Sequence, residues 1–139
     1  KFEAGTQNFA SVATLKPATD FINLLNDNKL IKNIDDIRDF ILDKLTTDER
    51  IKVYGVPCGT TDEKIPLFSF TVEGVHHEDL ALILDKMGIA VRSGQMCAEP
   101  LMNRFGVTGM LRVSLAPYNT MQEAEYFIKC LNKAINMLK

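Results

Sequence analysis

The chain has 139 residues, 46% hydrophobic and 24% charged, a composition typical of one soluble globular domain with a core of its own. Sixteen lysines and arginines stand against eighteen acidic residues, and neither sign gathers into a block, so the sequence argues against a nucleic-acid-binding protein or a polybasic membrane anchor. The apolar runs are far shorter than the roughly 18 residues that span a bilayer, and no signal peptide is visible, so we expect neither a membrane protein nor an exported one.

Three cysteines, Cys58, Cys97 and Cys130, are widely spaced along the chain. An odd number at such spacing fits neither a disulfide framework nor a paired zinc-binding motif, and we therefore expect a reducing, cytoplasmic environment. The chain begins at Lys1 and not at a methionine, and its first residues read as the middle of a protein. We interpret the chain as a piece of a longer protein.

The first two predicted elements are helices. Residues 8–26 carry apolar side chains at spacings that a helix gathers onto one face, and Pro17 among them predicts a kink or a new helix start. A second helix is expected from Asn33, which is a candidate N-cap. The apolar stripe of this second helix consists of Ile34, Ile37, Ile41 and Leu45.

Two strands, a helix and a third strand are predicted next. Residues Ile51–Tyr54 and Leu67–Val72 are short, β-prone and separated by a polar loop, which predicts a neighbouring antiparallel pair. Residues 77–87 have a helical apolar pattern that a glycine ends. Residues 89–91 then predict a strand that delivers Arg92 into a loop.

The last part of the chain combines a long loop, a strand and a closing helix. Residues 93–109 contain glycines, a proline and a cysteine, which predicts a long structured loop of the kind that usually serves function. Residues 111–115 predict a strand, and Thr120 with Glu123 predicts a capping box at the start of the last helix. The expected fold class is α+β, with a small, mostly antiparallel sheet and helices packed on it.

Cys97 is the most distinctive residue of the long loop. It lies between the strand-end Arg92 and an Ala-x-Pro turn, where a mobile thiol could act as a nucleophile if a nearby cation favours the thiolate. The alternative is an inert small apolar residue, which is the commoner role of a lone cysteine. Cys58 and Cys130 are interpreted as structural or incidental.

Arg112 lies among apolar residues of a predicted strand, where a guanidinium is expensive to bury without an anion. The partner is either a substrate carboxylate, which matches the planar fork of the guanidinium, or an internal Asp or Glu. His76 and His77 are adjacent but lack further spaced ligands, so they are a weak metal signal. We favour a surface role for both histidines at a helix start, and we expect no metal site.

Five segments carry a resemblance to a known family. They are FEAGT at 2–6, GIAVRSG at 88–94, CA at 97–98 with PLM at 100–102, RVSLA at 112–116 and YNT at 118–120. In order and spacing they resemble the carboxy-terminal third of the Suf-type, or group II, cysteine desulfurases, also described as selenocysteine lyases. These enzymes belong to the class V, fold-type I aminotransferase superfamily and use pyridoxal 5′-phosphate.

The resemblance implies roles for residues of the long loop and the following strand. The family's persulfide-forming cysteine falls on Cys97, and its substrate-carboxylate arginine falls on Arg112. Arg92 matches a further active-site position that we assign to substrate binding. Relatives often carry histidine where this chain has Gln95 and Met96, so proton transfer or loop mobility is expected to differ.

The resemblance also implies how the chain relates to the cofactor. Thr6 matches a threonine that contacts the cofactor phosphate of the partner subunit, and a lysine after a histidine holds the cofactor in a part of the family sequence upstream of this segment. Residues 1–30 would be a connecting segment and interdomain helix region, and residues 31–139 the small C-terminal domain, with the large cofactor-binding domain absent. Alone, the chain is expected to bind no pyridoxal 5′-phosphate and to be inactive.

The implied reaction takes sulfur from L-cysteine as a persulfide, releases L-alanine and passes the sulfur to a Suf-type acceptor protein for iron–sulfur cluster assembly. The complete enzyme is expected to be a homodimer. Two alternatives remain: a selenocysteine lyase, which shares the same framework, and a non-catalytic persulfide carrier or interaction module.

Overall fold

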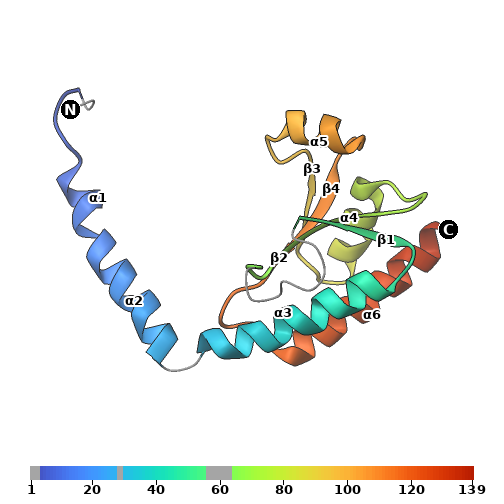
Figure 1. Cartoon of the computed structure of the whole chain (residues 1–139), viewed down its shortest axis with the longest axis horizontal. Helices are drawn as coiled ribbons and strands as arrows, with labels where there is room; N and C mark the ends of the chain where they lie inside the picture. The colour runs from blue at the N-terminus through green and yellow to red at the C-terminus, as the bar shows by residue number, and fades with distance from the viewer. Residues whose placement is uncertain (1–3, 28–29, 56–63) are drawn as a thin grey trace.

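The computed structural model describes residues 4–27, 30–55 and 64–139 (Figure 1). Within these residues the helices are α1 (Phe9–Ala13), α2 (Leu15–Asp27), α3 (Leu30–Thr47), α4 (His77–Lys86), α5 (Glu99–Phe105) and α6 (Met121–Leu138). The strands are β1 (Ile51–Tyr54), β2 (Leu67–Val72), β3 (Arg92–Gly94) and β4 (Met110–Ser114). None of the described helices is both long and apolar enough to cross a membrane.

The strands form a four-stranded sheet in the order β1-β2-β4-β3, and each neighbouring pair is antiparallel. This confirms the expected α+β fold with a small antiparallel sheet, and also the pairing of the first two strands. Because side chains alternate between the faces of a strand, β2 and β4 send one set of residues towards the helices and the other set away from them. The buried set comprises Phe68, Phe70, Val72, Leu111 and Val113.

Three helices cover the buried face of the sheet. In Figure 1, α3 and α6 run side by side, and residues of both join α4, β2 and β4 in one apolar cluster. Fully buried side chains such as Ile37, Leu84 and Ile135 come from these three helices. The stripe predicted for the second helix is buried throughout, because Ile34, Ile37, Ile41 and Leu45 are at most 4% exposed.

The helices α1 and α2 project from this body as an arm (Figure 1). A short break at Thr14 separates them, and Pro17 lies in the first turn of α2, where its missing N–H leaves no helical hydrogen bond unmade. The predicted new helix start is therefore confirmed. The arm carries a set of exposed apolar side chains: Phe9, Val12, Leu15, Phe21, Ile22 and Leu24.

Two predictions about helix starts have different outcomes. The capping box at α6 is confirmed, because the Thr120 hydroxyl accepts from the Glu123 amide at 3.2 Å and the Glu123 carboxylate accepts from the Thr120 amide at 2.8 Å. The predicted N-cap at Asn33 is wrong, because α3 begins at Leu30 and Asn33 lies inside it. The apolar period that identified this helix does not locate its first turn.

Two further predictions, both around the long loop, are corrected. The strand expected at 89–91 is wrong, since the segment that pairs with β4 is Arg92–Gly94. Ile89 and Val91 are apolar because they pack against the core, not because they join the sheet. The loop expected at 93–109 contains α5, a seven-residue helix with Pro100 in its first turn and Gly106 in the left-handed conformation (φ 69°) at its end.

Arg50 ties the start of β1 to the last helix. Its guanidinium donates to both carboxylate oxygens of Asp48, at 2.8 and 2.6 Å, and to the side-chain oxygens of Asn132 and Asn136, at 2.7 and 2.8 Å. The hydrogen bonds from Arg50 hold the pKa of Asp48 below its usual range, and those to Asp48 raise the pKa of Arg50. A carboxylate with a lowered pKa stabilises the folded chain above its ordinary pKa, and this stabilisation is lost as the pH falls through the folded-state value.

We predict that Asp48→Asn lowers the free energy of unfolding of this chain by about 0.5–1 kcal/mol at pH 7, after allowance for solvent screening. The difference from the unmodified chain should shrink as the pH falls below about 4, where the carboxylate becomes protonated. Urea titrations across this pH range measure it. Asp43→Asn is the matched control, because the Asp43 pair with Lys44 is 60% and 46% exposed and should contribute little at any pH. If the difference in unfolding free energy caused by Asp48→Asn stays constant with pH, the ion pair between Asp48 and Arg50 does not stabilise the fold.

Candidate active site

A polar row crosses the sheet on the face turned away from α3, α4 and α6. Arg92 of β3 pairs with Arg112 of β4, Arg112 with Ser69 of β2, and Ser69 with Tyr54 of β1. Residues paired in this way lie on the same face, opposite the face that holds Phe68 and the rest of the core. The sheet therefore carries a line of polar side chains from one edge to the other.

A cavity of about 560 Å³ lies over this row. Three members of the row, Tyr54, Ser69 and Arg112, line it together with Lys64 and with residues of the segment from Gln95 to Phe105. The Phe105 ring meets the Tyr54 ring at 4.9 Å between centroids, which connects the end of α5 to β1. The short helix that the sequence left undetected thus forms one wall of the cavity.

Arg112 is half-buried, and its Nε atom is buried with no hydrogen-bond partner. No carboxylate of the described residues forms a salt bridge with it, so the internal Asp or Glu considered from the sequence is not seen there. Arg92 lies directly opposite in the sheet and is exposed. The two positive charges of Arg92 and Arg112 repel each other across the strand pair unless an anion neutralises them. The buried Nε–H of Arg112, which has no partner, also needs an acceptor. The arrangement suits an anionic ligand.

Cys97 lies in a tight turn that follows β3. The Ala98 amide donates to the Gln95 carbonyl at 3.0 Å, and the two residues inside the turn, Met96 and Cys97, have positive φ angles of 55° and 60°. This is the pattern of a type I′ turn, which favours glycine, asparagine or aspartate. Each non-glycine residue held in this conformation costs about 1–2 kcal/mol, and such strain gathers at functional sites.

The turn exposes Cys97 while its neighbours line the cavity. Met96 and Ala98 are lining residues, and Cys97 is exposed and free. Cys130 is buried on α6, and Cys58 lies outside the described residues. Of the two cysteines that the structure describes, Cys97 is thus the one placed beside residues that line the Arg112 cavity and open to solvent.

Thr6 is not brought near the cavity. It is exposed, it precedes α1 of the projecting arm, and it is not among the residues that line the cavity; the adjacent Gly5 has a φ of 87°. Of the predicted residues, Arg112 lines the cavity, Arg92 pairs with it in the sheet, Cys97 lies between two lining residues in the chain, and Thr6 has none of these relations.

Sequence reasoning missed Lys64 and Ser69. Lys64 is the last residue of the polar loop predicted between the first two strands, yet it is buried, with 9% of its surface exposed. Ser69 lies within an apolar strand, and its place beside Arg112 follows from the pairing register of β2 with β4. An unexplained hydroxyl in a strand is a signal that could have identified Ser69, whereas nothing local marks Lys64.

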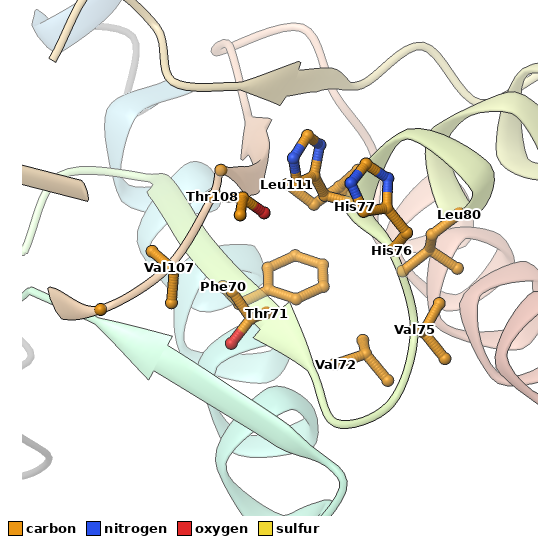
Figure 2. Close-up of a pocket in the computed structure, with 12 residues that line it drawn as sticks. Phe70, Thr71, Val72, Val75, His76, His77, Leu80, Val107, Thr108 and Leu111 are labelled. Atoms are coloured by element: carbon orange, nitrogen blue, oxygen red, sulfur yellow. The ribbon is translucent and has the colours of Figure 1, made fainter. Parts of the chain in front are cut away.

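A second, smaller cavity lies at the start of α4 (Figure 2). His76 caps this helix, because its Nδ1 accepts from the Glu78 amide at 3.4 Å, which confirms the helix-start role. His77 stacks on His76 at 4.3 Å and packs against Gly109, where a Cβ atom would lie 2.4 Å from the ring. The ring of His77 is thus not on the surface as expected, and burial lowers its pKa. No group of three possible metal ligands occurs among the residues that the structure describes.

Comparisons with known proteins give a consistent set of similarities. The family model described as aminotransferase class-V matches residues 1–127. The chain is 42% identical over 139 residues to a probable cysteine desulfurase of Xylella fastidiosa strain Temecula1, covering 99% of this chain and 32% of the relative. It is 33% identical to the cysteine desulfurase CsdA of Escherichia coli K12, covering 99% of this chain and 33% of that protein.

Solved structures show the same fold. The crystal structure of CsdA from Escherichia coli superposes with a TM-score of 0.77 at 32% identity, over 99% of this chain and 33% of that one. The apo cysteine desulfurase from Thermococcus onnurineus NA1 has a TM-score of 0.82 at 29% identity, over 98% of this chain and 33% of that one. The chain spans about one third of the length of these relatives.

The strained turn makes a prediction about stability. We expect Cys97→Gly to be more stable than Cys97→Ala by about 0.5–1 kcal/mol, because glycine adopts a φ of 60° without the penalty that alanine retains. Both variants lack the thiol, and the residue is exposed, so lost packing contributes little to the comparison. Chemical denaturation of the two variants measures the difference. Equal stabilities would show that the turn does not hold residue 97 in the left-handed conformation.

Proposed function

We propose, from the premise that this chain belongs to the class-V aminotransferase family, that it works as the small C-terminal domain of a pyridoxal-phosphate-dependent cysteine desulfurase. The observation that carries the proposal is the strained, exposed Cys97 turn beside a cavity where the buried Nε of Arg112 has no partner. A nucleophile and an anion-binding group at one cavity suit an amino-acid substrate with a sulfur to transfer. The desulfurases among the relatives support the same assignment.

The proposed reaction moves one sulfur atom from L-cysteine to Cys97. The Cys97 thiolate attacks the substrate sulfur, a sulfur–sulfur bond forms, and the bond between the substrate Cβ and sulfur breaks with its electron pair left on the substrate carbon. A proton then reaches that carbon, so the products are L-alanine and a persulfide on Cys97. Cys97 must be exposed for two steps of this reaction. Its thiolate has to reach the substrate sulfur, and the persulfide must next pass to an acceptor protein.

Arg112 would hold the substrate carboxylate in this scheme. Its guanidinium matches a carboxylate with two parallel hydrogen bonds, and the buried Nε supplies one donor already shielded from water. Arg92 lies opposite and adds positive charge at the exposed side of the row. Holding the carboxylate turns a loose encounter into an oriented one, which places the substrate sulfur relative to the Cys97 turn.

The residues of the chain fit a role beside the cofactor. Thr6, exposed next to a glycine with positive φ, offers a hydroxyl and backbone amides to a phosphate, and its place before the projecting arm, outside the lining of the Arg112 cavity, suits the cofactor of the partner subunit in a homodimer. Pyridoxal phosphate, when bound, supplies the electron withdrawal that weakens the bond between Cβ and sulfur. The lysine that holds it belongs to the large domain in our proposal, so this chain alone should be inactive.

The finer assignment is a Suf-type, group II enzyme that hands its sulfur to a Suf-type acceptor for iron–sulfur cluster assembly in the cytoplasm. A thiol that must stay reduced between turnovers fits that compartment. A selenocysteine lyase and a non-catalytic persulfide carrier are the competing functions. Assays of the complete enzyme and of Cys97→Ala with both amino acids separate them, because a lyase keeps activity on selenocysteine without Cys97 and a carrier has no activity on L-cysteine.

The first test of the proposed function concerns the nucleophile Cys97. In the complete enzyme, Cys97→Ala should abolish persulfide formation from L-cysteine while cofactor absorbance persists, because the phosphate contact and the cofactor lysine are untouched. Mass spectrometry of the unmodified enzyme after turnover should find the additional sulfur on Cys97. Additional sulfur on Cys58 or Cys130, or a normal rate for Cys97→Ala, would refute the assignment.

The second prediction concerns Arg112. Arg112→Lys keeps the charge but loses the bidentate fork, so kcat/KM for L-cysteine should fall by about tenfold to a hundredfold. Steady-state kinetics of the complete enzyme test this. Arg104→Lys on α5 is the matched control, because Arg104 is exposed and is not among the residues that line the cavity, and it should leave kcat/KM unchanged.

A further inference from the structure

The second cavity, at the start of α4, brings two histidines against the segment that joins α5 to β4. Its volume is about 260 Å³, and residues 106–109 belong to its lining. Figure 2 shows the imidazole rings of His76 and His77 side by side, and their centroids are 4.3 Å apart. The 106–109 segment follows α5, which forms one wall of the Arg112 cavity, and leads into the strand that carries Arg112. A contact that holds this segment therefore also holds part of the candidate active site.

The His77 ring holds the 106–109 segment by packing directly on Gly109. A Cβ atom at Gly109 would come within 3.0 Å of three atoms of this ring, of which Nε2 is the nearest. Gly109 is buried, and its φ is not among the positive ones, so glycine is required there for the close approach of the ring and not for its backbone freedom. The ring thus lies against the backbone at the last residue before β4.

The surroundings of the His77 ring suit a neutral imidazole and not a charged one. Its Nδ1 atom is buried and has no hydrogen-bond partner among the described residues, and its Nε2 atom is turned to Gly109. A neutral ring carries one N–H group, whereas an imidazolium carries two, and each needs an acceptor. Protonation therefore adds a charge to the ring and leaves the buried Nδ1 as a donor without an acceptor, which is unfavourable.

The charged groups that act on His77 all belong to the start of α4. Burial is the largest cause that lowers the pKa of His77, the neighbouring His76 lowers it further, and Glu78 and Asp79 raise it. The 106–109 segment and the residues of β2 and β4 add only apolar residues, threonines and glycines to the lining of this cavity. Because the folded-state pKa is lowered, the packed arrangement is favoured above about pH 6.5 and becomes less favourable as the pH falls below it.

We propose that His77 is a proton-controlled latch between the start of α4 and the 106–109 segment. In its neutral form the ring packs on Gly109 and holds the segment against α4. In its charged form the ring leaves this contact for solvent, and the segment is released together with the end of α5. The latch is a property of the fold of this domain, so it does not depend on the proposed sulfur transfer.

The end of α5 is the part of the chain that reports the release. Its closing hydrogen bonds run from the Gly106 amide to the Asn103 carbonyl at 3.2 Å and from the Val107 amide to the Met102 carbonyl at 3.1 Å. A helix of seven residues has little stability of its own, so it depends on the contacts at its ends. Amide hydrogen exchange over residues 99–109 therefore measures whether the segment is held.

The test follows this exchange in the complete enzyme at pH 7.5 and pH 5.5 by mass spectrometry, with each rate divided by that of unstructured peptide at the same pH. We expect the corrected rate over residues 99–109 to rise about threefold to tenfold at pH 5.5, because the released ring binds a proton with the ordinary pKa of about 6.5. In His77→Gln, whose amide does not titrate, this rise should be lost. His76→Asn is the matched control, because asparagine also caps a helix, and the rise should remain since burial acts on His77 more strongly than His76 does.

Gly109→Ala tests the contact from its other side. The added methyl group takes the space of the His77 ring, so the corrected rate over residues 99–109 should be raised already at pH 7.5 and should change little at pH 5.5. If Gly109→Ala does not fold, the two histidine variants decide the question.

Several outcomes would overturn the latch. They are an unmodified enzyme whose corrected rate does not rise at pH 5.5, a His77→Gln variant that keeps the full rise, a His76→Asn variant that loses it, or a folded Gly109→Ala variant that behaves as the unmodified enzyme does. None of these measurements requires turnover of L-cysteine. The latch and the proposed function can therefore fail separately.

Discussion

The pairing of β4 with a strand on each side is the constraint on which the rest of the structure depends. Its register sets Leu111 and Val113 against the helices and turns Arg112 to the other face. A slip of one residue would exchange the two sets, burying a guanidinium in the core and exposing the apolar side chains. The apolar packing that stabilises the domain therefore also fixes where its anion-binding group lies.

The two faces of the sheet have opposite relations to stability. On the helix-covered face, close-packed apolar side chains stabilise the fold. On the other face, opposed arginines and a left-handed turn both work against it. Such features persist because the packed face holds the backbone in place, and they concentrate at one cavity. The domain thus uses the stability of one face to maintain an unfavourable arrangement on the other.

Sequence patterns located most of the fold but less of the site. The period of Ile34, Ile37 and Ile41 and the capping pair at α6 are local signals, and both elements are present. Residues 89–91 were misassigned because a buried loop and a buried strand have the same composition, and α5 was missed because seven residues give too short a period. Cys97 and Arg112 stood out by chemistry, whereas the burial of Lys64 depends on contacts with Phe68 and the cavity that no local pattern encodes.

The side-by-side packing of α3 and α6 (Figure 1) has a consequence for the order in which the chain acquires its structure during synthesis. The last helix supplies Phe127, Leu131 and Ile135 to the same cluster that holds Ile37 and Leu45 of α3. A growing chain emerges from its amino end, so α3 and α4 cover only part of the cluster before the 18-residue helix α6 has left the ribosome. Until then the apolar side chains that α6 covers stay exposed on the nascent domain, and it is in this interval that chaperones would matter most.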